Sequence, residues 1–189
     1  MIVREFSLLP FPGEENAADL EIAGAIVRRT ERLSIRCALR GDLSKIKIPA
    51  PKQRPERKDR LWEETCVELF LGETDSERYW EFNLSPSGDW NVYRFASSRK
   101  GMQEEPAFTS LAFGVRSEPE SLLLSLELDI GKIVPAGNGV DAAVSAVVKT
   151  ARSRISHWAL THPSPRPDFH RRDGFRLNLP GAYRPDSRS

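Results

Sequence analysis

Three short segments in the middle of the chain alternate apolar and polar residues with the period of β-strands. They cover residues 65–71, 78–84 and 90–95, and successive side chains of a strand point to opposite faces of a sheet. Residues 72–77 are polar and begin with glycine, and residues 85–89 combine proline with glycine, as hairpin loops do. The pattern therefore predicts three consecutive antiparallel strands.

The register implied by these loops gives the three strands two different faces. One face is apolar and is predicted to be core: Val67, Leu69, Leu71, Trp80, Phe82, Leu84, Trp90 and Val92. The other mixes acids, amides and rings: Cys66, Glu68, Phe70, Tyr79, Glu81, Asn83, Asn91, Tyr93 and Phe95. We expect Glu68 beside Glu81, and Glu81 beside Tyr93. Like charges repel across a sheet, so the acids need an arginine or lysine, a shared proton, a cation or a bound ligand.

Further strand patterns lie on both sides of this centre. We expect strands at residues 19–29, 32–40, 108–116, 121–129, 140–150 and 175–179, the fifth being ambiguous between strand and helix. Many short strands without a long helix or a repeat predict an all-β fold, a two-sheet antiparallel β-sandwich of jelly-roll or immunoglobulin-like type. We expect a single domain over residues 1–180, with a flexible tail at 181–189.

Composition excludes some classes of protein. The 189 residues include 28 Lys and Arg against 27 Asp and Glu, so no net field attracts nucleic acid, and the arginines are scattered among acids. Cys37 and Cys66 have no metal-ligand spacing and are expected to be free thiols.

The first thirteen residues do not read as a targeting segment. Arg4 and Glu5 are charged, and Pro10 and Pro12 interrupt the short apolar run, which fits neither a signal peptide nor a spanning helix. We expect a cytoplasmic protein without a membrane partner.

Two loops lie near the polar face in the sequence. Residues 49–60 are rich in proline and charge, which indicates either a solvated linker or an arm that gates a site. Residues 157–179 hold all three histidines, and His162, Asp168 and His170 lie in their proline-rich part. These groups suit a metal, acid–base chemistry or ligand contact, but they match no strong metal signature. No phosphate-binding loop or GxSxG motif is present.

A family resemblance is carried by four stretches: LWEETCVELFLG (61–72), YWEFNLSPSGDWNVYRF (79–95), RKGM (99–102) and HPSPRPDFHRRDGFRLNL (162–179). Together they resemble DOMON-like domains related to carbohydrate-binding module family nine, over most of the chain. The central strands and the PDFH loop are the strongest part. The resemblance implies a β-sandwich that binds sugar or haem as a module, rather than an enzyme.

In the sugar-binding relatives, aromatic rings sandwich the saccharide while polar side chains take its hydroxyls. The acidic face offers the same mixture, so we expect a saccharide or related small molecule there, partly covered by the PDFH loop. The candidate ligand-binding residues are Trp62, Glu68, Phe70, Tyr79, Glu81, Asn83, Asn91, Tyr93, Asp168 and His170. The remaining tryptophans, Trp80, Trp90 and Trp158, are expected to be core.

Two other classes of function fit the same face. A scaffold domain would dock another protein there, its acids neutralised by that partner or by Arg36, Arg171 or Arg172. Alternatively, Glu68 and Glu81 would act as the two carboxylates of a retaining glycosidase. An open cleft lined by acids and rings favours a ligand site, whereas buried salt bridges to internal arginines favour a structural network.

Haem is a further alternative, implied by the haem-binding relatives, in which a Met and a His hold the iron. Met102 is the only methionine besides Met1, and His157, His162 or His170 could oppose it. The main interpretation needs neither haem nor a metal ion.

Overall fold

Strands make up nearly all regular structure in the computed structural model, which describes residues 1–14, 19–135 and 137–181. The strands are β1 (Ile2–Pro10), β2 (Glu21–Arg29), β3 (Arg32–Arg40), β4 (Cys66–Glu73), β5 (Tyr79–Leu84), β6 (Trp90–Phe95), β7 (Gln103–Glu104), β8 (Ala112–Glu118), β9 (Ser121–Asp129), β10 (Val140–Lys149), β11 (Ile155–Ala159) and β12 (Leu177–Leu179). Four single-turn 3-10 helices join them: η1 (Leu43–Lys45), η2 (Leu61–Glu63), η3 (Ile130–Lys132) and η4 (Arg172–Gly174). The predicted all-β fold is confirmed. Of the predicted tail, residues 182–189 lie outside the described residues.

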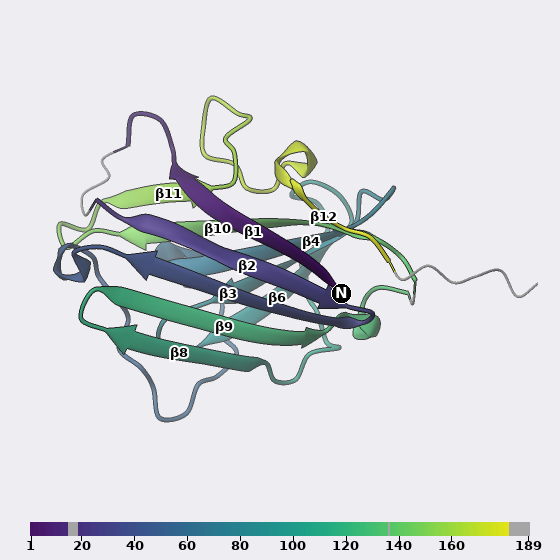
Figure 1. Cartoon of the computed structure of the whole chain (residues 1–189), viewed down its shortest axis with the longest axis horizontal. Coiled ribbons are helices and arrows are strands. Elements are labelled where there is room, and N and C mark those ends of the chain that lie inside the picture. The colour runs from purple at the N-terminus through teal and green to yellow at the C-terminus, as the bar shows by residue number, and fades with distance from the viewer. Residues whose placement is uncertain (15–18, 136, 182–189) are drawn as a thin grey trace, which may run out of the picture.

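The strands form one continuous antiparallel path that curls back on itself, in the order β7-β6-β5-β4-β10-β11-β1-β2-β3-β9-β8, with β12 also paired to β10 (Figure 1). Strand β1 joins its two parts: residues 2–8 pair with β2, whereas Leu9 and Pro10 pair with β11. We call β1, β2, β3, β9 and β8 the front half, and the other strands the back half. The two predicted sheets are therefore continuous through β1.

The main hydrophobic core lies between the two halves. It combines front residues such as Ile22, Ile26 and Leu124 with back residues such as Leu69 and Phe82, all buried. Trp80, Trp90 and Trp158 belong to it as predicted. Burial of these inner faces removes apolar surface from water, which is the main driving force for this arrangement.

The register of the central hairpin differs from the prediction by two residues. Strand β4 continues to Glu73, so Glu68 lies opposite Asn83, and Phe70 lies opposite Glu81. Glu68 and Glu81 are therefore diagonal neighbours and not directly opposed. A shift of two keeps every side chain on its predicted face, and the predicted pairing of Glu81 with Tyr93 is confirmed.

The bounds of the other predicted strands agree with the structure to different extents. Residues 140–149 are a strand, as chosen over a helix, whereas the strand predicted from residue 108 begins at Ala112 and the last begins at Leu177. Strands β1, β7 and β11 were not predicted. Strands β7 and β11 are short, and β1 ends at Pro10, the first of the two prolines that interrupt the apolar run in the sequence.

The proline-rich segment at 49–60 is packed against the sheet and is not a free linker. The backbone N–H of Trp90 donates to the carbonyl of Glu56 at 3.1 Å, and that of Lys58 donates to the carbonyl of Trp90 at 2.9 Å. Arg57 also donates to Asn91 Oδ1 at 2.8 Å. These bonds hold the segment beside β6, next to the predicted polar face.

The outer face of the back half is also buried. Its apolar side chains Phe70, Tyr79, Tyr93, Phe95 and Ala143 form a second cluster with Phe175, against which Trp62, Leu160 and Phe169 pack. The covering residues come from η2 and from the loop between β11 and β12 (the C-terminal loop, residues 160–176). In the described part of the chain, no helix is long and apolar enough to cross a membrane.

Candidate functional site

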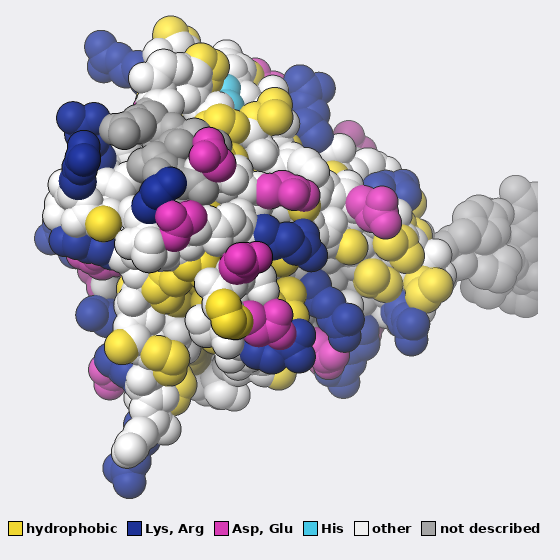
Figure 2. Space-filling view, turned by 60° about the vertical axis from the view of Figure 1, so that its left-hand side comes forward, with side chains coloured by type: hydrophobic (Ala, Val, Ile, Leu, Met, Phe, Trp, Pro, Cys, Tyr) yellow, Lys and Arg dark blue, Asp and Glu magenta, His cyan; other side chains and the backbone are white. Residues whose placement is uncertain are grey.

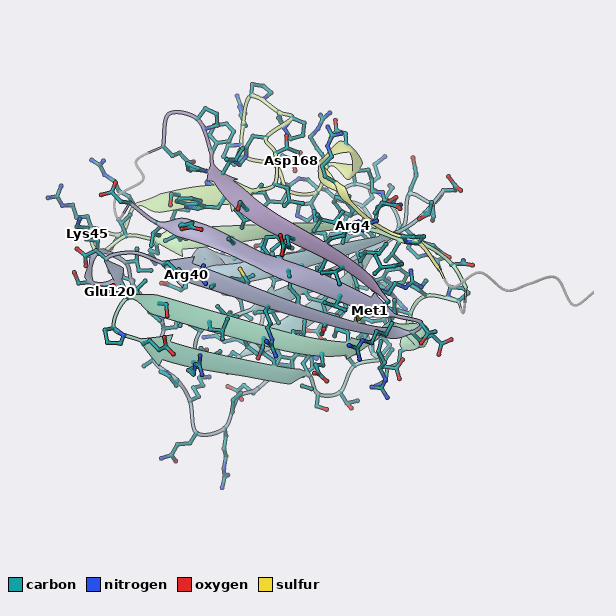
Figure 3. The ribbon with its side chains drawn as sticks, in the orientation of Figure 1. Met1, Arg4, Arg40, Lys45, Glu120 and Asp168 are labelled. Carbon is teal, nitrogen blue, oxygen red and sulfur yellow. The ribbon has the colours of Figure 1, made fainter. Side chains whose placement is uncertain are left out.

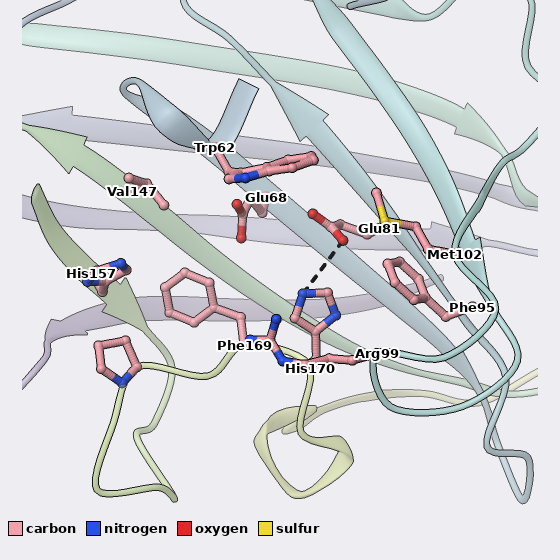
Figure 4. Close-up of a pocket in the computed structure, with 11 residues that line it drawn as sticks. Trp62, Glu68, Glu81, Phe95, Arg99, Met102, Val147, His157, Phe169 and His170 are labelled. Atoms are coloured by element: carbon pink, nitrogen blue, oxygen red, sulfur yellow. Dashed lines mark ion pairs between the residues drawn. The ribbon is translucent and has the colours of Figure 1, made fainter. Parts of the chain in front are cut away.

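A cavity of about 340 Å³ lies between the outer face of the back half and its covering loops. This volume falls within the range of small-molecule sites. It is lined by Trp62, Glu68, Glu81, Phe95, Arg99, Met102, Val147, His157, Pro167, Phe169 and His170 (Figure 4). The sheet supplies both glutamates, while η2, the β6–β7 loop and the C-terminal loop supply most of the surrounding groups.

Two buried carboxylates line the cavity. Glu68 is 3% exposed and accepts a hydrogen bond from Ser145 Oγ at 3.0 Å. Glu81 is 4% exposed and accepts one from Asn83 Nδ2 at 2.7 Å. Within the described residues, the other oxygen of each carboxylate makes no hydrogen bond to the protein, so each keeps free acceptor capacity toward the cavity.

Burial and mutual repulsion favour the protonated form of these acids. Burial raises the pKa of Glu68 to about 8, and the nearby charge of Glu81 adds to the rise. Burial also raises the pKa of Glu81 to about 7, against the opposing effect of its bond from Asn83. The two groups titrate as an interacting pair near neutral pH.

A hydrogen-bond chain fixes His170 beside this pair. Tyr79 Oη accepts the backbone N–H of Arg99 at 3.1 Å and lies 2.8 Å from His170 Nδ1. Since the Tyr79 oxygen already accepts the Arg99 N–H, we assign its hydroxyl as the donor to Nδ1, which places the remaining proton of a neutral ring on Nε2. That nitrogen lies 3.9 Å from Glu81 Oε2. Burial lowers the pKa of His170 to about 4, and the charge of Arg99 adds to the effect.

An ion pair joins two of the covering loops. Arg99 Nη2 lies 2.8 Å from Asp168 Oδ1, and the same oxygen accepts the backbone N–H of His170 at 3.2 Å. Figure 3 labels Asp168 in the C-terminal loop, and this residue is not among those that line the cavity. Asp168 therefore holds the loop that carries His170 and does not itself line the cavity.

The other predicted site residues form the layer beneath the cavity. Asn91 donates to Tyr93 Oη at 2.8 Å, and Tyr93 donates to Asp59 at 2.5 Å. Trp62 packs edge-on against Tyr93, with ring centroids 5.8 Å apart. Phe70, Tyr79 and Asn83 are buried as well. Of the ten predicted residues, the cavity is lined by Trp62, Glu68, Glu81 and His170.

The arginines proposed as partners of the acids lie elsewhere. Arg36 is exposed on β3 in the front half, because its side chain points away from the core. Arg171 pairs with Asp173 at 2.6 Å. Arg172 approaches Asp141 at 3.8 Å and covers Gly72. These three predictions were wrong.

Neither a metal nor haem fits the lining well. The described residues contain no group of three or more His, Cys, Asp or Glu side chains able to hold a metal ion. Met102 and His170 line the same cavity, but His170 Nδ1 is bound to Tyr79, and its Nε2 faces Glu81. A porphyrin ring here would bury both glutamates against an apolar surface, which is costly for carboxylates.

Several lining residues were not among the predicted site. Phe95 was on the predicted face but was not selected, and Phe169 lies inside the PDFH motif. Arg99 adopts a positive φ of 57° in its loop, a conformation that the sequence RKGM does not predict. Val147 and His157 lie opposite each other on β10 and β11, and this pair lies beside β4 and β1, which are distant in sequence.

The outer surface carries no single-sign stripe on the face that Figure 2 displays. Lysine and arginine side chains are interspersed there with aspartate and glutamate. This mixture agrees with the balanced charge of the sequence and provides no electrostatic footprint for nucleic acid on that face.

No protein-family model and no curated protein matches the chain. Solved structures do match. A protein of Bacteroides uniformis, named as a candidate carbohydrate-binding protein, aligns with a TM-score of 0.70 at 14% identity over 95% of this chain and 87% of that one. A family 9 carbohydrate-binding module of Caldicellulosiruptor kristjanssonii aligns in its cellotriose complex (TM-score 0.57, 9% identity, 97% and 85% covered) and in its glucose complex (0.52, 9%, 89% and 80%). The chain therefore shares the all-β fold of these proteins.

Proposed function

We propose that this chain is a non-catalytic carbohydrate-binding domain of DOMON-like, jelly-roll type, and that its saccharide or related small ligand lies in the cavity over β4 and β5. The observation that carries this proposal is the pairing of buried carboxylates with aromatic rings around one concave space. Glu68 and Glu81 form the polar floor, and Trp62, Phe95 and Phe169 lie around it. No cofactor is required.

The lining matches the two-sided chemistry of a sugar. Sugar rings have apolar C–H faces and polar edges, so aromatic faces and hydroxyl acceptors must occur together. Charged or partly charged carboxylates are strong acceptors for hydroxyl groups, and each glutamate keeps one oxygen without a protein partner among the described residues. Similarity of fold to sugar-binding modules supports the same class of ligand.

The same geometry favours a small ligand over a docked protein. The carboxylates are almost fully buried at the floor of a cavity, where a flat protein surface would not reach them. Among the described residues, neither carboxylate has the directly bonded arginine expected of a purely structural network. Recovery of intact oligosaccharides after long incubation would support the non-catalytic part of the proposal, and cleavage abolished by Glu68→Gln would contradict it.

Isothermal titration against glucose, cellotriose, glucosamine and N-acetylglucosamine tests the proposal. We expect saturable binding to at least one of them, and Trp62→Ala should weaken it by about tenfold or more, since it removes a large ring from the rim of the cavity. Arg36→Ala is the matched control, because that side chain is exposed on the front half. Absence of saturable binding, or equal binding by the Trp62 and Arg36 variants, would overturn the proposal.

A further inference from the structure

Acidic side chains outnumber lysine and arginine among the described residues that line the cavity. Glu68 and Glu81 have no hydrogen-bonded or ion-paired lysine or arginine within the described residues. Among the described lining residues, Arg99 is the one lysine or arginine, and its guanidinium is already held by Asp168 through two bonds of 3.2 and 2.8 Å. A neutral His170 supplies no charge. The charge of Arg99 favours the ionised form of both glutamates, but a cation bound inside the cavity would add the direct contact to their oxygens that Arg99 does not make.

Glu81 Oε2 indicates where such a cation would bind. Glu81 Oε2 belongs to a residue that is 4% exposed, and His170 Nε2 lies 3.9 Å from it, beyond hydrogen-bond length. In Figure 4, the carboxylates of Glu68 and Glu81 both project into the space beneath Trp62. This oxygen of Glu81 keeps acceptor capacity toward the cavity, so a donor from the ligand would give it a partner.

We propose that the ligand presents a protonated amine to Glu68 and Glu81, and that the cavity selects amino sugars over the matching neutral sugars. This inference rests on the proposed function, because it names the class of saccharide that the same cavity takes. An ammonium group offers three donors and a full charge, which matches two carboxylates better than a hydroxyl does. The surrounding rings of Trp62 and Phe169 add the attraction of aromatic faces for cations.

A metal ion fits the same charges less well. Hard cations require six or more oxygen ligands in most sites, and here the two carboxylates are joined by no third His, Cys, Asp or Glu in the described residues. An ammonium needs fewer partners. It also stabilises the ionised form of both acids on binding, which offsets the effect of burial.

The experiment compares glucosamine, glucose and N-acetylglucosamine by titration at pH 7, with cyclohexylamine as an amine that has no hydroxyl groups. We expect glucosamine to bind at least about tenfold more tightly than glucose, as a charge-assisted hydrogen bond exceeds a neutral one by about that factor. N-acetylglucosamine should resemble glucose, since its amide is neutral.

The outcomes separate this inference from the proposed function. Equal affinity for glucosamine and glucose would overturn the amine preference and leave sugar binding intact. Binding of cyclohexylamine with no binding of any sugar would overturn the proposed function and support an amine site. No binding of either class would overturn both.

Two conservative variants test whether Glu68 and Glu81 bind the amine. Glu68→Gln and Glu81→Gln keep the size of the side chain and remove its charge. Each should reduce the ratio of glucosamine to glucose affinity toward one, whereas Arg36→Gln should leave the ratio unchanged. Thermal unfolding of each variant checks that the fold is retained, and an unchanged ratio in both folded glutamate variants would contradict the role assigned to these residues.

Discussion

The outer faces of the two halves of the sheet differ in what covers them. On β3 of the front half, buried positions alternate with exposed ones, and Arg32, Arg36 and Arg40 point to solvent. On β4 and β5 of the back half, every residue from Cys66 to Gly72 and from Tyr79 to Leu84 is buried. Both halves carry an alternating sequence, yet only the back half encloses the polar residues of its outer face.

The difference arises from segments that cover the back half, one adjacent to β4 in sequence and the other far from it. Trp62 lies on η2 before β4, and Phe169, His170 and Phe175 lie about a hundred residues later. Polar side chains that alternate with apolar ones are ordinarily solvated. Once they are enclosed, their charges and hydrogen bonds become strongly coupled, and this coupling sets the site apart from the front half.

The largest expected effect comes from emptying the enclosed face. Phe70 is fully buried and contacts Tyr79, Phe175 and His170 with ring centroids 5.4 to 6.3 Å apart. Phe70→Ala should lower the free energy of unfolding by about 3–5 kcal/mol, as buried Phe→Ala changes do. Arg36→Ala, on the outer face of the front half, should change it by less than about 0.5 kcal/mol.

Denaturant titration of both variants measures this contrast. Comparable losses in the two would show that the outer faces do not differ in packing. The slope of the unfolding free energy with denaturant should stay equal to that of the parent protein, so that the change reports stability and not altered compactness of the unfolded chain.

The second prediction concerns pH. The pKa values of Glu68 and Glu81 are raised from 4.5 to about 8 and about 7, so between pH 4.5 and these values the folded state binds more protons than the unfolded state. Stability should therefore fall as pH rises, by up to about 1.4 kcal/mol per pH unit for each acid. His170, with its pKa lowered from 6.5 to about 4, opposes this trend between pH 4 and 6.5. The steepest fall is expected between about pH 6.5 and 7.

Urea unfolding at a series of pH values measures this slope. The double variant with Glu68→Gln and Glu81→Gln should lose most of the decline above pH 6.5 and exceed the parent protein in stability at pH 8. A parent protein whose stability is constant from pH 6.5 to 8 would contradict the raised pKa values. Arg36→Gln serves as the front-half control and should keep the parent slope.

The third prediction removes a single oxygen from the enclosed face. Tyr79→Phe leaves the Arg99 N–H and His170 Nδ1 without their shared partner, which should cost about 1–3 kcal/mol of stability, the cost of leaving buried polar groups unsatisfied. Without the hydroxyl donor, Nδ1 is free to carry the ring proton. Nitrogen NMR shifts of His170 should then show a mixture of tautomers, where the parent protein shows the Nε2–H form. An unchanged single tautomer would contradict the hydrogen-bond chain.

Local alternation was enough to predict which residues share a face. The central strands, the inner tryptophans and the acidic face follow from a period of two, which persists even though the hairpin register was wrong by two residues. The neighbours of Glu68 and Glu81 do not follow, because they depend on where the turn begins, and Gly72 and Glu73 extend β4 instead of opening the loop.

The sequence did not predict which residues surround Glu68 and Glu81 in the cavity. Asp168 and His170 were predicted to contact a ligand on the acidic face, through the resemblance of the PDFH loop; His170 lines the cavity, whereas Asp168 holds the loop beside it. The positions of Arg99, Met102 and Val147 depend on how loops and β10 meet across the sheet, and no local pattern encodes that. The same holds for Arg36, whose alternation fits either half until the strand order is known.

The smallest expected effect tests whether the covering loops are held by charge. Asp168 accepts two bonds from Arg99 and one from the His170 backbone, but the Arg99 side chain is 58% exposed. Exposed pairs contribute about 0–1 kcal/mol and are screened by salt, so Asp168→Asn should reduce stability by no more than that. Because the pair joins the two loops that carry Arg99 and His170, the variant should release bound ligand faster in stopped-flow measurements, while the Arg171→Gln control, whose pair with Asp173 lies within one loop, should not. A parent-like release rate in Asp168→Asn would mean that the Arg99–Asp168 pair does not slow ligand release. The packing of the rings alone would then hold the cover of the back half closed.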